Sequence, residues 1–120
     1  MHSQMNKQEI LEIVGGRIKI HESDNGSAIT LKYTGNEFDV FVTIPFGICE
    51  FFYDAKDKNG SVILHDWHDH YGEDKVADYR ESLEYLASIP AKAKFRITNS
   101  GKTIQVFNKS WEYLFGQASI

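Results

Sequence analysis

A chain of 120 residues, 42% of them hydrophobic and 25% charged, has room for a single domain and does not have the composition of a disordered protein. Seventeen acidic residues against thirteen basic ones give a net charge of −4. This charge argues against general binding to nucleic acid or to anionic lipid surfaces, because both attract basic faces. An acidic surface favours a basic protein partner instead.

Cysteine usage and hydropathy predict a cytoplasmic protein. Cys49 is the only cysteine, so no intrachain disulfide forms, and a reducing compartment such as the bacterial cytosol is expected. The first residues contain no apolar run of the kind that a secretory signal needs. The longest nearly apolar stretch, residues 40–49, is about half of the ~20 residues that cross a bilayer, so no membrane span is predicted.

The first predicted element is a short helix that ends at Gly15 and Gly16. Asn6 is a candidate cap for its first turn, and Glu9 stands three residues later, as in a capping box. The apolar residues that share one face of this helix are Ile10, Leu11 and Val14.

A series of alternating apolar and polar segments follows and predicts a meander of strands. These segments are residues 18–20, 29–33, 38–44, 48–53 and 62–64. The turn signals between them are Asp24-Asn25-Gly26, Gly35-Asn36, Pro45-Phe46-Gly47 and Lys58-Asn59-Gly60. Connections this short leave no room for parallel crossovers, so successive strands are expected to pair in antiparallel fashion.

The second half of the chain is predicted to hold the longer helix, over residues 73–89, and further strands. Its apolar stripe has helical spacing and consists of Val76, Tyr79, Leu83 and Leu86. Residues 95–97 and 104–106 then predict two paired strands, whereas residues 111–115 fit either a final strand or one helical turn. The whole pattern predicts a single α+β domain over residues 1–120, a mostly antiparallel meander sheet with two helices packed on one face.

The residues best suited to chemistry lie between the meander and the long helix. Residues 65–74 include three histidines and four carboxylates but no lysine or arginine. Imidazole and carboxylate groups are ligands that zinc or nickel accepts, so His65, His68 and His70 are candidate metal ligands. The alternative is a polar recognition loop before the long helix. Its binding residues would be Asp66, Trp67, Asp69 and Tyr71.

A second candidate surface is aromatic. One face of the sheet must pack on the helices, and the other would carry Phe41 together with either Phe51 or Phe52. Phe41 and Phe51 are the partner-binding residues that we predict here, since exposed aromatic side chains mark interaction sites. The alternative is that a loop, the C-terminal tail or a second copy of the chain covers this face, and the last case would give a homodimer.

Catalytic signatures do not occur elsewhere in the sequence. Cys49 alternates within an apolar strand, so a buried thiol is its expected state. None of the serines beside a glycine lies in a G-x-S-x-G motif, and no phosphate-binding glycine motif is present. The sequence therefore favours a protein that is not an enzyme and needs no cofactor.

Two functions are consistent with these observations. The first is a small acidic protein-binding module, for example an immunity-type protein that neutralises a toxin. In element order the chain is also similar to type III secretion chaperones, which run helix, three strands, helix, two strands, helix, although the hairpin over residues 48–64 departs from that order. The second is a small metal-binding protein or metal-dependent hydrolase, in which His65, His68 and His70 hold the ion and a neighbouring aspartate activates water.

Overall fold

The computed structural model describes residues 7–14, 21–24, 28–71, 75–98 and 103–116, and for residues 21–24, 65–68 and 70 it describes the backbone alone. The described chain forms two helices and two antiparallel sheets. The helices are α1 (Lys7–Val14) and α2 (Val76–Ser88). The strands are β1 (His21–Asp24), β2 (Ala28–Thr34), β3 (Phe38–Pro45), β4 (Glu50–Asp57), β5 (Val62–His70), β6 (Phe95–Thr98), β7 (Thr103–Phe107) and β8 (Trp111–Gly116).

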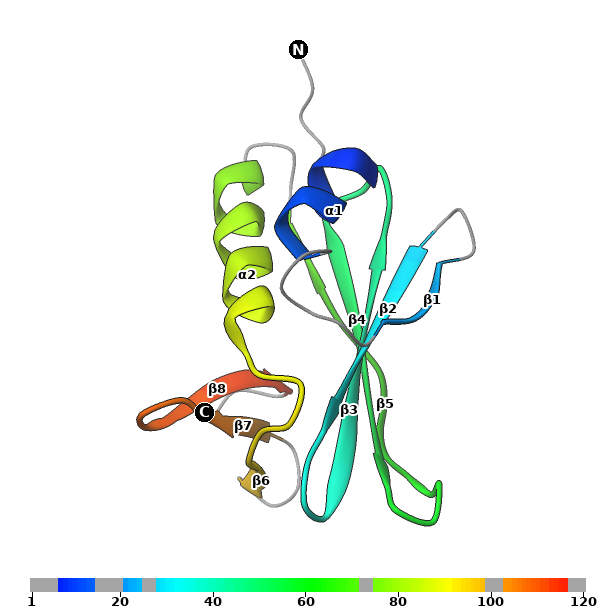
Figure 1. Cartoon of the computed structure of the whole chain (residues 1–120), viewed down its shortest axis with the longest axis vertical. Helices are drawn as coiled ribbons and strands as arrows, with labels where there is room; N and C mark the ends of the chain where they lie inside the picture. The colour runs from blue at the N-terminus through cyan, green and yellow to red at the C-terminus, as the bar shows by residue number, and fades with distance from the viewer. Residues whose placement is uncertain (1–6, 15–20, 25–27, 72–74, 99–102, 117–120) are drawn as a thin grey trace.

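The larger sheet is the meander that the sequence predicts. Its strand order is β1-β2-β3-β4-β5, and each strand pairs with the next in antiparallel fashion. Gly47 and Gly60 have φ of 86° in the β3–β4 and β4–β5 turns, a left-handed conformation that suits glycine. The predicted fold class, an α+β domain with an antiparallel sheet and two helices on one face, is confirmed (Figure 1).

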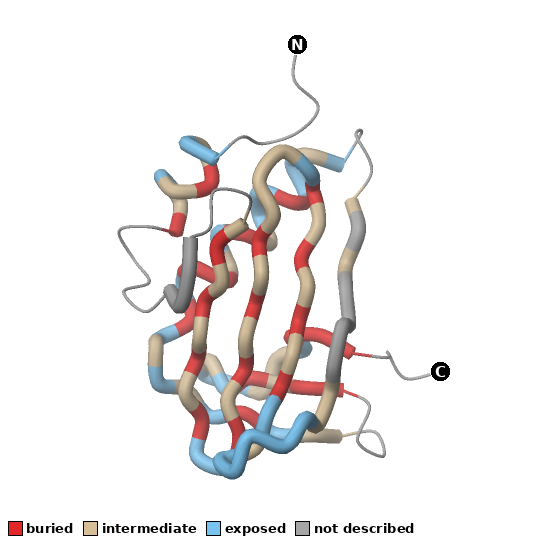
Figure 2. The backbone as a smooth tube through the Cα atoms, turned by 90° about the vertical axis from the view of Figure 1, so that its right-hand side faces the viewer, coloured by how far each residue is buried: buried red, intermediate tan, exposed pale blue. Residues whose placement is uncertain are grey.

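One face of the five-stranded sheet is buried and the other is not. Buried and half-buried residues alternate along β2, β3 and β4, as the two-residue period of a strand requires (Figure 2). Figure 1 shows that α1, α2 and the smaller sheet all lie on the same side of this sheet. The core therefore lies on one side, between the sheet and these three elements.

Aromatic rings lie at the main contacts between the elements of that core. Phe51 stacks on Tyr79 of α2, with ring centroids 4.7 Å apart. Tyr53 stacks on Phe115 of β8 at 4.4 Å and thereby joins the two sheets. The Tyr33 hydroxyl donates a hydrogen bond of 2.6 Å to the carbonyl of Leu86 near the end of α2. Large flat side chains suit this space because each fills a thin layer between a sheet and a helix.

The smaller sheet has the order β6-β7-β8 and follows α2 through a short connection. Two backbone hydrogen bonds join that connection to Thr34, the last residue of β2. The amide of Thr34 donates to the carbonyl of Ala91, and the amide of Ala93 donates to the carbonyl of Thr34, at 2.8 and 3.0 Å. These bonds fix where the smaller sheet begins, so its inner residues pack against the larger sheet.

The structure corrects the sequence prediction in one place and decides an open alternative in another. Residues 65–70 do not form a loop, because β5 continues through His70, which pairs with Glu50. A polar run is compatible with a strand here because β5 is the edge of its sheet. Residues 111–115, which the sequence leaves undecided, lie in strand β8, which pairs with β7. The expected strand over residues 18–20 and the carboxylates Glu73 and Asp74 lie outside the described residues.

Candidate functional site

The structure places Phe41 and Phe51, the two aromatic residues predicted to bind a partner, on opposite faces of the larger sheet. Phe51 has 0% exposure and lies on the inner face of the sheet, so it cannot contact a partner. It is buried because its ring fills the space under α2, where Tyr79 covers it. Phe52, its neighbour, is half-buried and lies on the outer face with Phe41. The one-residue difference exchanges the two faces of a strand.

The predicted metal site falls where the structure describes only the backbone. His65, His68 and His70 lie in β5, and their side chains, like those of Asp66 and Trp67, lie outside the described residues. Across the β4–β5 ladder, His68 pairs with Phe52 and Trp67 pairs with Tyr53. Among the side chains that the structure does describe, no group of three or more His, Cys, Asp or Glu residues is arranged to hold a metal ion.

Two predicted binding residues, Asp69 and Tyr71, line the same small cavity of about 160 Å³. We call it the tyrosine cavity. It lies where β4, the end of β5, α2 and β8 meet, so four separate segments contribute to it. Its lining residues are Tyr53, Asp69, Tyr71, Ser82, Tyr85, Leu86, Tyr113 and Leu114. Tyr53, Leu86 and Leu114 are buried, whereas Tyr113 is 48% exposed and marks the side that faces solvent.

Hydrogen bonds fix the hydroxyl groups around the tyrosine cavity. The Tyr71 hydroxyl and the Ser82 hydroxyl lie 2.7 Å apart and share one hydrogen bond. The Tyr85 hydroxyl donates to Glu112 Oε1 at 2.9 Å, and the Tyr113 hydroxyl donates to the carbonyl of Gly116 at 2.7 Å. These bonds hold the side chains in place before any ligand arrives, which lowers the entropy cost of binding.

Burial, with nearby carboxylates, raises the pKa of three tyrosines that line the cavity. Burial, followed by the charge of Asp69 and a hydrogen bond to it, raises the pKa of the Tyr53 hydroxyl well above its usual value. Burial and then the same charge raise the pKa of Tyr113. Burial raises the pKa of Tyr85, and its hydrogen bond to Glu112 raises it further. These shifts keep Tyr53, Tyr85 and Tyr113 in the neutral hydroxyl form.

The outer side of the smaller sheet carries an aromatic surface that the sequence analysis missed. We call it the aromatic face, and its residues are Lys94, Arg96, Phe107 and Trp111. The Phe107 and Trp111 rings meet edge to face with centroids 5.4 Å apart, and Phe107 is 42% exposed. The Arg96 guanidinium lies 4.2 Å from the centre of the Trp111 ring, and Lys94 Nζ lies 5.9 Å from that of Phe107.

A sequence signal for the aromatic face was present. Phe107 and Trp111 flank the tight turn of residues 108–110, so two aromatic residues stand opposite each other across a hairpin. Aromatic pairs at directly opposite positions are common stabilising pairs of antiparallel sheets. The sequence alone does not show that Phe107 and Trp111 are paired across a hairpin, because residues 111–115 fit a helical turn as well as a strand.

On the outer face of the larger sheet, two lysine side chains lie over the ring of Phe41. Phe41 is half-buried, and the ammonium groups of two lysines from neighbouring strands lie above it. Lys32 Nζ is 6.0 Å and Lys56 Nζ is 5.4 Å from the centre of the Phe41 ring. The predicted binding residue Phe41 is thus on the outer face, under lysine side chains that shield it from solvent.

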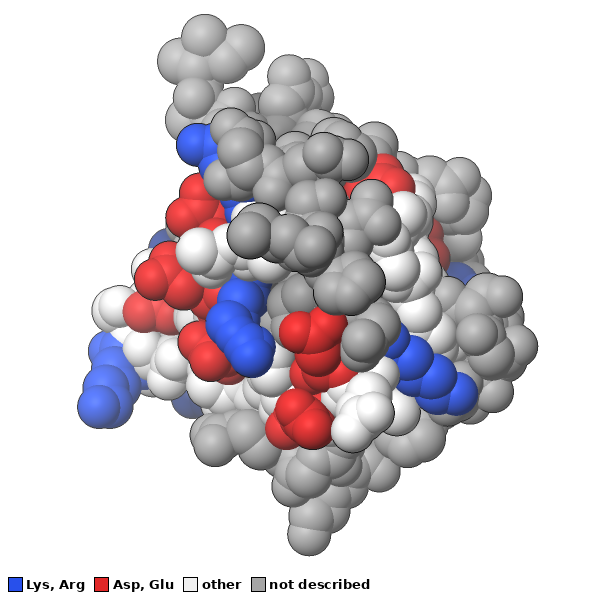
Figure 3. Space-filling view, turned by 90° about the horizontal axis from the view of Figure 1, so that it is seen from above, with Lys and Arg blue, Asp and Glu red and all other residues white. Residues whose placement is uncertain are grey.

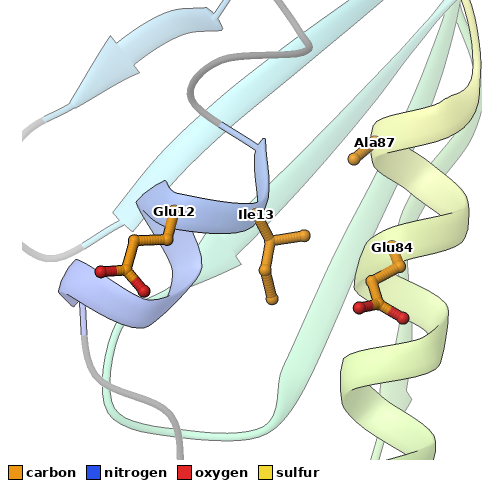
Figure 4. A pocket seen from close by; sticks show the side chains of 4 residues that line it. All are labelled: Glu12, Ile13, Glu84 and Ala87. Carbon is orange, nitrogen blue, oxygen red and sulfur yellow. The ribbon is translucent and has the colours of Figure 1, made fainter.

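A second hollow, of about 450 Å³, lies between the two helices and is lined by Glu12, Ile13, Glu84 and Ala87. Figure 4 shows Ile13 between the two glutamates, and the Glu12 carboxylate points away from α2. The two carboxylates therefore do not converge on one ligand. Figure 3, which looks down on this end of the molecule, shows acidic and basic side chains interspersed and no patch of a single sign among the described residues.

Comparison of the chain with protein families, with curated proteins and with solved structures gives no match. The observed element order is helix, five strands, helix, three strands. It departs from that of type III secretion chaperones at the extra hairpin and again at the C-terminal strand, where those proteins have a helix. Neither of the two described helices is long and apolar enough to cross a membrane.

Proposed function

We propose that this protein is a protein-binding module and that its partner docks on the aromatic face. The observation that supports the proposal is the composition of that face. Tryptophan, phenylalanine and arginine lie side by side on the outer side of a sheet, with Phe107 42% exposed. These residue types are enriched in protein interfaces. Aromatic rings bury much area with little loss of side-chain entropy, and arginine offers several hydrogen-bond donors in a fixed geometry.

The stacked arrangement also supports binding. Arg96 Nε donates to Gln105 Oε1 at 2.7 Å, and the guanidinium lies over the Trp111 ring, so both planes are held in position. An arginine has further N–H donors in a fixed geometry, which suit a carboxylate or a backbone carbonyl. We therefore propose that the partner places an acidic or carbonyl oxygen beside Arg96 and an apolar side chain on Phe107.

This local charge modifies the partner expected from the sequence. The net charge of −4 favours a basic protein, and over long distances an acidic chain attracts such a partner. The aromatic face itself carries Lys94 and Arg96, so acidic groups are favoured at the contact. An immunity-type role, in which binding neutralises a toxin, remains one specific form of this proposal.

Affinity capture from cells that naturally make the protein tests the proposal. The three baits are the unmodified protein, Trp111→Ala and Val62→Ala, and Val62 is an exposed hydrophobic residue at 52% on the larger sheet. We expect one partner whose affinity falls by about tenfold or more with Trp111→Ala and stays within about twofold with Val62→Ala. Circular dichroism of all three baits verifies that they are folded.

The results separate the possible partners. A captured toxin whose activity is lost on binding would establish the immunity-type role. A dimer in sedimentation that Trp111→Ala converts to monomer would identify the partner as a second copy of the chain. Equal capture by the unmodified protein and Trp111→Ala would show that the aromatic face is not the docking surface.

A further inference from the structure

We propose that the tyrosine cavity binds a small alkylammonium group. The inference does not depend on the aromatic face, because it concerns a different set of residues and a ligand small enough to be enclosed. It rests on three properties of the cavity, which are its size, the sign of its charge and the hydrogen-bonding state of its hydroxyl groups.

The size limits the ligand to a small group. A volume of about 160 Å³ is near that of a cavity that holds one small ring. At roughly 30 Å³ for each water molecule, it corresponds to about five waters, or to about five heavy atoms of a ligand. The head group of a methylated amine is of this size, whereas a nucleotide or a sugar is too large to be enclosed.

The charge at the cavity excludes anions. Asp69 lines it, and Glu112 lies at its border, where it accepts the hydrogen bond of Tyr85. The described lining residues include neither lysine nor arginine. A carboxylate ligand would therefore face two like charges without a cation to offset them, while a cation meets attraction from both.

The hydroxyl groups that line the tyrosine cavity offer a ligand mainly hydrogen-bond acceptors. Tyr53, Tyr85 and Tyr113 each donate their hydroxyl hydrogen to a protein oxygen. Tyr71 and Ser82 share one hydrogen bond, so of these five hydroxyls only one hydrogen remains available. What the cavity presents is chiefly lone pairs, a carboxylate and the rings of tyrosines.

These three properties match the recognition of an ammonium ion. Aromatic rings attract a cation through the negative charge of their faces, and several rings around one carboxylate form the kind of cage that holds methylated ammonium groups. The hydrogen-bonded tyrosines are arranged in advance, so little order must be gained on binding. The same head group occurs on a free amine and on a methylated lysine side chain, and the experiment below distinguishes these sources.

The test compares choline with 3,3-dimethylbutan-1-ol, which has the same shape with carbon in place of the charged nitrogen. Binding is followed on the protein alone, by calorimetry and by the proton resonance of the ligand methyl groups. We expect choline to bind and its methyl resonance to move upfield, because aromatic rings lie beside it. The uncharged analogue is expected to bind about tenfold more weakly or worse, because it lacks the charge.

Matched variants assign this binding to the cavity. Asp69→Asn keeps the shape and an acceptor for the Tyr53 hydroxyl but removes the charge, and we expect it to weaken choline binding by about tenfold or more. Tyr113→Leu removes a ring at the exposed side and is expected to weaken binding about threefold or more. Asp54→Asn, on the outer face of β4, makes the same change of net charge away from the cavity and should stay within about twofold of the unmodified protein.

Three results would overturn the proposal. Equal binding of the two ligands would show that the cavity selects apolar shape, and no shift with either would show that it holds only water. Equal losses in Asp69→Asn and Asp54→Asn would show that net charge alone attracts choline.

A peptide amide of trimethyllysine that binds more tightly than choline would point to a protein side chain as the source, and the reverse order would point to a free amine. Both orders support the alkylammonium class.

Discussion

The outer faces of the two sheets both pair cations with aromatic rings, but the pairs have different consequences. On the larger sheet the ring of Phe41 lies beneath Lys32 and Lys56. On the smaller sheet two rings touch each other, and Arg96 stacks on Trp111 while Phe107 stays exposed. Two lysines lie over the half-buried ring of Phe41, whereas one lysine, Lys94, lies over Phe107, which keeps 42% of its surface exposed. The exposed ring is the one that another protein can contact.

The number of aromatic residues in a segment therefore does not identify a binding surface. The aromatic-rich segment of β4 places Phe51 in the core and Phe52 on the outer face. What distinguishes a docking surface is whether neighbouring side chains cover its rings or hold them open.

Exchanging Phe51 and Phe52 in turn for alanine measures how different the two faces of one strand are. Phe51→Ala removes a fully buried ring that stacks on Tyr79, and we expect it to lower the free energy of unfolding by about 3–5 kcal/mol. Phe52→Ala removes a half-buried ring and should cost about 1–2 kcal/mol. Urea denaturation of both variants measures the difference, and equal losses would contradict the one-sided core.

Alkaline pH tests whether the two sheets unfold together. Burial raises the pKa of Tyr33 and of Tyr53, which stacks on Phe115 between the sheets. The stability from these protonated tyrosines is complete below the unfolded pKa of about 10 and falls as the pH rises, by up to about 1.4 kcal/mol per pH unit for each tyrosine. We expect tyrosinate absorbance and the loss of circular dichroism to rise in a single transition above pH 10. Two separate transitions would show that the sheets are independent.

Removing one aromatic ring from each outer face tests whether the partner contacts the smaller sheet and not the larger one. Phe41→Ala loses a half-buried ring with two lysines above it and should lower the free energy of unfolding by about 1–2 kcal/mol without changing partner affinity. Phe107→Ala should cost less than about 1 kcal/mol but reduce partner affinity about tenfold. Thermal melts and quantitative capture give both values. If Phe41→Ala reduced capture as strongly, the larger sheet would also contact the partner.

The smallest expected effect concerns metal. If His65, His68 and His70 form a zinc or nickel site, the melting temperature rises with metal concentration, and His68→Ala or EDTA removes the rise. A protein-binding module without a metal site predicts the same melting temperature in zinc, nickel and EDTA. We expect the second result. A rise that depends on His68 would support the metal hypothesis instead.

The sequence predicted most of the fold because its signals are local. Apolar and polar residues alternate over residues 29–44, and Asn59-Gly60 is a short turn signal. Both patterns depend only on neighbouring residues, so they predict the strands and their antiparallel pairing. The extension of β5 through His70 could not, because pairing with β4, and not local preference, decides it. The choice between Phe51 and Phe52 depends in the same way on register.

The candidate sites were harder to predict than the fold. The sequence predicts Asp69 and Tyr71 as binding residues because they belong to a polar segment, and the structure places both beside Tyr85 of α2 and Tyr113 of β8. No local pattern links these segments, since the cavity exists only once the two sheets and α2 have packed. The aromatic face required knowing that residues 111–115 form a strand.

The bonds between Thr34 and the segment after α2 have a consequence for the order of folding. They join β2 to residues far along the chain, with the whole β3–β5 meander and α2 in between. Closing so long a loop costs entropy that is recovered only after the local hairpins have formed. The smaller sheet is therefore expected to dock late, and both the tyrosine cavity and the fixed position of the aromatic face come into being at that last step. A chain that is still emerging from the ribosome would then have its meander before it has either of the two surfaces for which binding is proposed.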